Sequence, residues 1–170
     1  LFLGSGSRLI AAERTGRVVR VPEGILRHPQ HAFMLANVDG VTDDQRLVEI
    51  KTARSAQDWG EPGTDEVPQA YLIQVQHYLS VTALSVADVA VLIAGSDFRL
   101  YEVPADPELQ GMIIEGEAAF WQRVVDGIPP EPVSYADMQL RYGRASHEAR
   151  VIAGREIVEA LRDCSDGKFN

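Results

Sequence analysis

Two carboxylates and a lysine lie on neighbouring parts of the sequence, in a pattern that suits metal-assisted chemistry. Asp39 precedes the run Glu49-Ile50-Lys51. If residues 46–52 form a β-strand, Glu49 and Lys51 project to one face and Ile50 projects into the core, because side chains alternate along a strand. Two carboxylates and a main-chain carbonyl make a hard oxygen site that suits Mg²⁺. A lysine beside such a site can orient a water molecule and offset charge on a phosphate, so the pattern predicts phosphodiester cleavage.

Lys51 is also singled out by composition. The chain has 16 lysines and arginines, and only Lys51 and Lys168 among them are lysines. Two ordinary explanations stay open at this point. The Asp39-Gly40 pair is typical of a hairpin turn, and a Glu-x-Lys run on a strand can be a solvated stripe.

Composition excludes several classes of protein. A chain of 170 residues with 45% hydrophobic residues is expected to form a single domain over residues 1–170, with 137–170 as a C-terminal helical extension. No apolar run is long enough to span a membrane, and the single Cys164 excludes disulfide frameworks and four-cysteine metal sites. A net charge of −9 argues against a broad basic surface for nucleic acid, but it is compatible with one local DNA channel.

The predicted elements alternate between helix and strand. A helix over 8–14 precedes three strands, at 18–21, 31–38 and 46–52, and the last two are expected to form a hairpin through the turn 39–45. The remaining elements are a helix over 68–82, strands at 88–94 and 98–103, a helix over 107–126 and a last helix over 146–164. This order predicts an α/β domain with a central mixed β-sheet flanked by helices.

The helix over 68–82 has two distinct faces. Its core face carries Leu72, Val75 and Leu79 at helical spacing. The other face carries Tyr71, Gln74 and Tyr78. In the simplest interpretation the tyrosines are half-buried and Gln74 is exposed to solvent.

The motifs in order are Asp39-Gly40, Glu49-Ile50-Lys51-Thr52, Trp59, Pro68, Tyr71-x-x-Gln74-Val75-Gln76-His77, Val81-Thr82, Phe120-Trp121 and Gly127-Ile128-Pro129-Pro130. This set resembles the YqaJ-type viral recombinases, which are relatives of lambda exonuclease within the PD-(D/E)xK nuclease superfamily. The resemblance covers roughly residues 13–135 and implies a restriction-endonuclease-like core.

The resemblance also implies roles for individual residues. Asp39 and Glu49 would be metal ligands together with the carbonyl of Ile50, and the metal would be Mg²⁺, with Mn²⁺ as a substitute. Lys51 would be the catalytic lysine. The residues expected to support catalysis are Gln74 and Tyr71, and those expected to contact DNA are Arg54, Ser55 and Gln76.

The implied activity is 5′→3′ digestion of linear duplex DNA from its ends, in phage-type recombination or DNA repair. The implied partners are double-stranded DNA ends, a single-strand annealing protein and further copies of the chain in a trimeric ring. The expected location is the cytoplasm of a bacterium or of a phage-infected cell. Two alternatives are a non-catalytic DNA-binding or assembly protein on the same fold and a site-specific endonuclease.

The N-terminal part departs from the family pattern. Relatives carry a glutamate ligand on a helix before the Thr-Gly pair, and the matching positions near residues 5–8 hold no carboxylate here. Val38 stands where a proline usually precedes the motif aspartate. We therefore expect the natural protein to have further N-terminal residues that supply the carboxylate and a clamp for a terminal phosphate.

Overall fold

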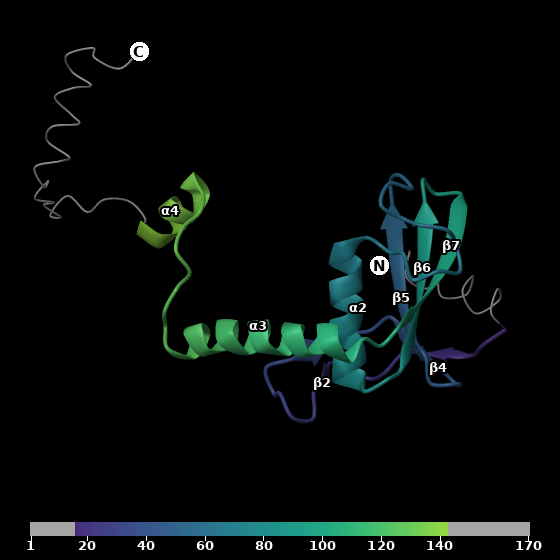
Figure 1. The fold of residues 1–170 in the computed structure, drawn as a ribbon, viewed down its shortest axis with the longest axis horizontal. Coiled ribbons are helices and arrows are strands. Elements are labelled where there is room, and N and C mark those ends of the chain that lie inside the picture. Colours follow the sequence, from purple (N-terminus) through teal and green to yellow (C-terminus); the bar gives the residue numbers. More distant parts are fainter. Residues whose placement is uncertain (1–15, 143–170) are drawn as a thin grey trace, which may run out of the picture. The chain divides into compact units, whose positions relative to one another are not determined.

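The computed structural model describes residues 16–142, and Figure 1 shows their arrangement. In chain order the elements are β1 (Val19–Arg20), β2 (Leu26–Arg27), β3 (Leu35–Ala36), β4 (Gly40–Thr42), β5 (Leu47–Ala53), α2 (Gln69–Thr82), β6 (Val86–Ile93), β7 (Asp97–Pro104), α3 (Pro107–Val125) and α4 (Tyr135–Tyr142). None of the described helices is long and apolar enough to cross a membrane.

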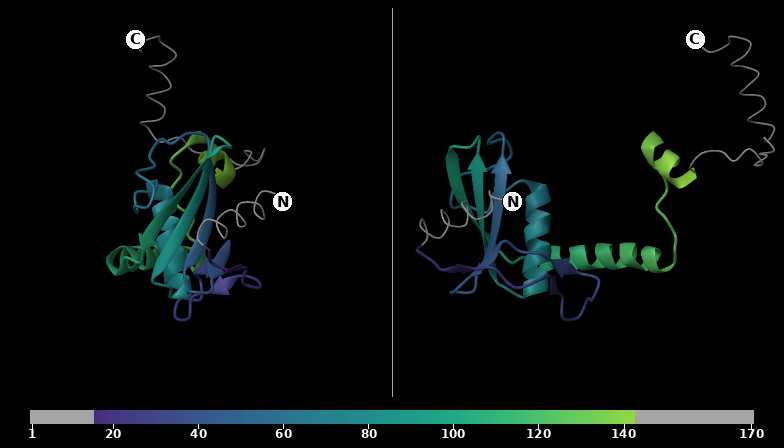
Figure 2. Two further views of the ribbon diagram at one scale, coloured as in Figure 1. Left: turned by 90° about the vertical axis from the view of Figure 1, so that its right-hand side faces the viewer. Right: turned by 180° about the vertical axis from the view of Figure 1, so that it is seen from behind.

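A five-stranded mixed sheet with strand order β1-β4-β5-β6-β7 forms the centre of the fold. Strands β5 and β6 are parallel, and all other neighbours in this sheet are antiparallel. Parallel neighbours need a crossover connection, which α2 supplies, and Figure 2 shows α2 along one face of the sheet. The predicted mixed sheet with flanking helices is therefore confirmed.

The hydrophobic core lies between α2 and this sheet face. Val75 and Leu79 of α2 are buried, and they belong to one cluster with buried residues of the sheet. The sheet residues in that cluster are Leu47, Ala87, Val89, Val91, Ile93, Tyr101 and Val103. The predicted core stripe of α2 is confirmed, with Leu72 half-buried at its edge.

The predicted hairpin is wrong in its pairing. Residues 31–38 contain only the short strand β3, which pairs with β2 in a separate two-stranded sheet. The partner of β5 is β4, whose first residue is Gly40, so the Asp39-Gly40 pair begins a strand instead of forming the turn. The turn lies at residues 43–46, where Gln45 has a φ of 62° and the Thr42 N–H donates to the Arg46 carbonyl (2.9 Å).

The expected direction of Ile50 is also wrong. Glu49 and Lys51 share the sheet face of Leu47, which is the face that packs against α2. Ile50 therefore projects to the opposite face, where it is half-buried. The two charged residues thus lie at the margin of the main core, and this position restricts their access to solvent.

The chain divides into two compact units, Leu1–Ile128 and Pro129–Asn170. The first contains both sheets, α2 and α3. The second contains α4, where the Asp137 N–H donates to Ser134 Oγ (3.2 Å). The predicted helices over 8–14 and 146–164 and the N-terminal positions discussed above lie outside the described residues.

Candidate active site

Asp39 lies directly before β4 and reaches the edge of β5. Strand β4 pairs with β5 only at Leu47 and Val48, and the side chain of Asp39 continues this pairing. Its Oδ2 accepts a hydrogen bond from the Ile50 N–H at 2.8 Å. The sequence prediction that Asp39 comes beside Glu49 across a hairpin holds, although β4, and not residues 31–38, forms that hairpin with β5.

Glu49 is the most buried acidic residue of this group, with 4% of its surface exposed. Its Oε1 accepts a hydrogen bond from Lys51 Nζ at 2.6 Å, whereas its Oε2 is buried and has no hydrogen-bond partner among the described residues. Burial raises the pKa of Glu49, the contact with Lys51 opposes this, and the charge of Asp39 raises the pKa further. A buried oxygen without a partner is rare in folded proteins and calls for a ligand.

Lys51 is held by groups from two elements. Its Nζ donates to Glu49 on the same strand and to Gln74 Oε1 on α2, each at 2.6 Å. It also lies 4.8 Å from the centre of the Tyr71 ring, within the range of a cation–π contact. Glu49, Lys51, Gln74 and Tyr71 therefore form one cluster, as the sequence predicted, and Gln74 is half-buried instead of exposed.

Tyr78 extends this cluster and was missing from the predicted site. A lysine ammonium has donors only, so Gln74 must present its oxygen to Lys51. This leaves Gln74 Nε2 to donate to Tyr78 Oη, at 3.1 Å. The signal for Tyr78 was present in the sequence, since it lies one helical turn after Gln74 on the same face.

The residues of the cluster fit a hard divalent cation. Within residues 16–142, no three His, Cys, Asp or Glu side chains gather to hold a metal, so a cation here would rely on Asp39, Glu49 and a main-chain oxygen. The N–H and C=O groups of one strand residue point to the same edge, so the Ile50 carbonyl points toward the side of Asp39. The unpartnered Oε2 of Glu49 and this all-oxygen donor set favour Mg²⁺ or Mn²⁺.

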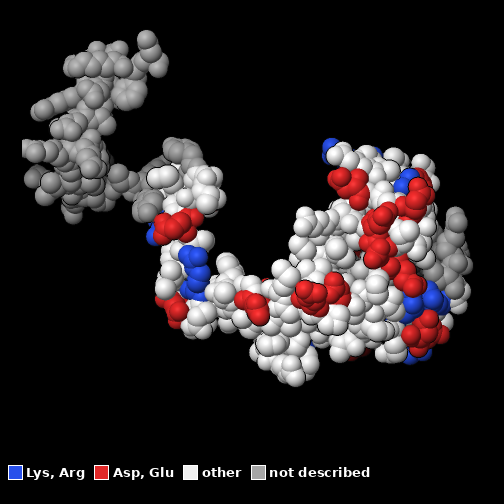
Figure 3. Space-filling view, viewed as in Figure 1, with Lys and Arg blue, Asp and Glu red and all other residues white. Residues whose placement is uncertain are grey.

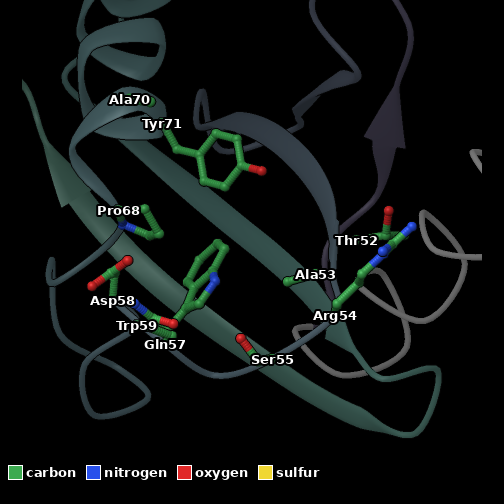
Figure 4. A pocket seen from close by; sticks show the side chains of 10 residues that line it. All are labelled: Thr52, Ala53, Arg54, Ser55, Gln57, Asp58, Trp59, Pro68, Ala70 and Tyr71. Carbon is green, nitrogen blue, oxygen red and sulfur yellow. The ribbon is translucent and has the colours of Figure 1, made fainter.

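The predicted DNA contacts fall in two different environments. Arg54 and Ser55 are exposed and line a hollow past the carboxyl end of β5 (Figure 4). Gln76 is 1% exposed and anchors the start of α3, since its amide donates to the Pro104 carbonyl (2.7 Å) and accepts from the Asp106 N–H (2.9 Å). Gln76 is thus engaged inside the protein and is not among the DNA contacts that we propose below.

Comparison with known sequences supports the resemblance seen in the motifs. Residues 11–85 match the family described as the YqaJ-like viral recombinase domain. A Bacillus subtilis (strain 168) protein named "Uncharacterized protein YqaJ" is 41% identical over 121 residues, which are 69% of this chain and 38% of that protein. The chain therefore spans less than half the length of this relative.

Comparison with solved structures supports the fold. The alkaline exonuclease LHK-Exo from Laribacter hongkongensis is 20% identical, with a TM-score of 0.57 over 75% of this chain and 72% of that chain. LHK-Exo in complex with dAMP is 18% identical, with a TM-score of 0.55 over 82% and 70% of the two chains. At this level of identity the match shows the fold alone, and it confirms the predicted restriction-endonuclease-like core.

Proposed function

We propose, from the YqaJ-like viral recombinase domain in residues 11–85, that this chain is a metal-dependent DNA exonuclease. It would hydrolyse phosphodiester bonds of linear duplex DNA in the 5′→3′ direction, in phage-type homologous recombination or DNA repair. The observation that carries the proposal is the buried, unpartnered Oε2 of Glu49, placed between the charges of Asp39 and Lys51.

Asp39, Glu49 and the carbonyl of Ile50 are the groups that would hold Mg²⁺, with Mn²⁺ as a substitute. When bound, the ion would supply Lewis-acid polarisation of the phosphate and a lowered pKa for an attacking water. Glu49 would then use both of its oxygens, one toward Lys51 and one toward the ion. This arrangement explains why a carboxylate is kept at a position where burial opposes its charge.

Lys51 would act on the reacting phosphate. Its ammonium carries three donors, of which Glu49 and Gln74 take two. The remaining N–H has no hydrogen-bond acceptor among the described residues. It would stabilise the negative charge that grows on the phosphate as the water oxygen attacks phosphorus and the bridging P–O bond breaks. Gln74 and Tyr71 would keep the ammonium in place.

The proposed partners follow from the same assignment. They are double-stranded DNA ends, a single-strand annealing protein and other copies of the chain in a ring of three. The proposed location is the cytoplasm of a bacterium or of a phage-infected cell. Arg54 and Ser55 would contact the DNA next to the cleaved bond, and the next subsection develops this contact.

The test is digestion of end-labelled linear duplex DNA and of closed circular duplex DNA by the same protein preparation. We expect the linear DNA to be degraded with Mg²⁺ or Mn²⁺, and no turnover with Ca²⁺, which coordinates more loosely and positions water poorly. Full activity in EDTA would end the metal-nuclease proposal. Cleavage of the closed circle would favour the site-specific endonuclease, and binding without cleavage would favour the non-catalytic alternative.

A further inference from the structure

A hollow of about 490 Å³ adjoins the catalytic cluster. It lies where β5 ends and α2 begins, and Tyr71 belongs both to its wall and to the surroundings of Lys51 (Figure 4). Its polar lining holds five hydrogen-bond donors and one carboxylate: the donors are Thr52, Arg54, Ser55, Gln57 and the ring nitrogen of Trp59, and the carboxylate is Asp58, which Figure 4 shows on the side away from Arg54. Donors of this kind recognise phosphate oxygens.

Arg54 brings a positive charge to the hollow, and Asp58, the carboxylate of the same lining, forms no ion pair with it. Half of the eight arginines within residues 16–142 form ion pairs, namely Arg17, Arg46, Arg99 and Arg141. Arg54 forms no ion pair within residues 16–142 and is exposed. Acidic side chains outnumber basic ones on the face shown in Figure 3, so one uncompensated arginine beside the site is a distinct local feature.

The wall of the hollow is fixed before any ligand arrives. Trp59 is 8% exposed, and its ring packs against Tyr71 (5.7 Å between centroids) and Tyr101 (5.1 Å). The loop next to it is tied down, because Tyr101 Oη donates to the Gly60 carbonyl and the Gly60 N–H donates to the Glu66 carbonyl, both at 2.8 Å. Binding to a preformed surface costs little ordering of the protein.

The ring nitrogen of Trp59 is the deepest donor of the hollow. In Figure 4 it faces the side formed by Ala53 and Ser55. It makes no hydrogen bond to any described residue, and it is not fully buried. It therefore remains accessible to a group that enters from solvent.

The position of the hollow selects which part of a DNA strand could enter it. Along extended backbone, Arg54 follows Lys51 at a separation of roughly 10 Å. A DNA strand whose cleaved phosphate contacts Lys51 would thus present a neighbouring phosphate, within a few nucleotides, to Arg54 and Ser55.

We propose that this hollow is a binding site for one further phosphate of the DNA strand that is being cut. Arg54 and Ser55 donate to its oxygens, and Trp59 Nε1, from which the Arg54 side chain extends away in Figure 4, donates to the attached sugar. The site holds the strand in register with Lys51. This inference rests on the proposed function, since it assumes that DNA is the substrate.

The experiment removes the charge from either side of the proposed contact. Duplex oligonucleotides that each carry one uncharged methylphosphonate near the end are bound to the full chain in Ca²⁺, and affinity is measured by fluorescence anisotropy. At one position the modification should weaken binding by the wild-type protein about fivefold to tenfold. In Arg54→Gln the same modification should have no further effect on affinity. The slope of log affinity against log salt concentration should become shallower by about one, which corresponds to one lost phosphate contact.

The matched control is Arg20→Gln. Arg20 is an exposed arginine on β1, which pairs with β4 and not with β5, so this variant loses the same charge away from the hollow. It should keep the full methylphosphonate effect. Ser55→Ala should weaken binding about threefold at the same position, and circular dichroism checks that each variant is folded.

The two proposals fail in different ways. If the wild-type protein cleaves linear DNA but no methylphosphonate position couples to Arg54, the phosphate site is wrong and the nuclease assignment stands. Equal losses in Arg54→Gln and Arg20→Gln would also overturn the phosphate site. If the wild-type protein neither binds nor cleaves DNA, the proposed function fails and the phosphate site fails with it.

Discussion

Two buried carboxylates on adjacent strands have the same exposure and opposite surroundings. Glu49 on β5 and Asp88 on β6 are each 4% exposed, and they project from opposite faces of the sheet. Asp88 accepts hydrogen bonds from Arg46 Nη2 at 2.6 Å and from Arg17 Nη1 at 3.0 Å. Glu49 has one bond, to Lys51, and one oxygen without a partner.

The difference separates a cluster that holds strands together from the proposed active site. Around Asp88 the charges are matched: its hydrogen bonds raise the pKa of Arg46, and Arg46 also contacts Glu102. This cluster ties the segments before β1 and β5 to β6 and β7. Around Glu49 burial raises the pKa of the carboxyl, and one buried acceptor is left open. Such an arrangement costs stability, and a bound cation would relieve the cost.

The largest expected effect comes from Lys51. Lys51→Ala should lower the rate of DNA cleavage by about 10³-fold, because it removes the donor that stabilises charge on the phosphate. Single-turnover assays on linear duplex DNA measure this effect. The fold and most of the metal binding should persist, and Lys51→Arg should restore little, since a guanidinium differs in shape from an ammonium. Cleavage at the wild-type rate would show that the site has been assigned wrongly.

Removing the central carboxylate of the Asp88 cluster should lower the stability of the fold. Asp88→Ala leaves Arg46 and Arg17 without their shared partner, and we expect a loss of about 3 kcal/mol in the free energy of unfolding. Urea denaturation measures it. Glu102→Gln is the control, because that side chain is 60% exposed and a surface ion pair contributes at most about 1 kcal/mol. If Asp88→Ala abolished cleavage in protein that is still folded, the division between the two clusters would be wrong.

Metal binding should distinguish the two carboxylates directly. With Mg²⁺ at about 100 times its dissociation constant, ligand linkage predicts a stabilisation of about 2.7 kcal/mol. Thermal unfolding with and without Mg²⁺ detects it, independently of activity. Asp39→Ala and Glu49→Ala should remove the stabilisation, whereas Asp88→Asn should keep it. A Mg²⁺ effect that survives in Glu49→Ala would place the ion elsewhere.

The sequence predicted best what depends on local periodicity. Alternation along β5 puts Glu49 and Lys51 on one face, and helical spacing in α2 puts Gln74 on the face that meets them. Both relations hold whichever strands become neighbours. The pattern was therefore enough to assemble most of the candidate cluster before any tertiary contact was known.

The errors concern long-range pairing. Asp39-Gly40 is typical of a turn, but Gly40 lies in β4. Glycine fits there because a Cβ would collide with the side chain of Val19 in the neighbouring strand β1. The face toward which Ile50 projects depends on which side of the sheet α2 covers, and the sequence of β5 contains no signal for that. The matched pairing of Asp88 with Arg17 and Arg46 also joins segments far apart in the chain.

The smallest expected effect concerns Tyr78, which touches the cluster only through Gln74. Tyr78→Phe removes the oxygen that accepts from Gln74 Nε2, so Gln74 is free to rotate and holds Lys51 less firmly. A hydrogen bond of this kind contributes about 1 kcal/mol, which corresponds to a loss of about fivefold in kcat with KM unchanged. Tyr71→Phe is the matched control on the same helix, because Tyr71 faces Lys51 with its ring and would keep that contact without its hydroxyl. Since both variants lose one hydroxyl from α2, an equal effect on kcat would show that Tyr78 does not position Gln74. A lower kcat in Tyr78→Phe alone would show that the order of the cluster extends beyond the residues that touch the substrate.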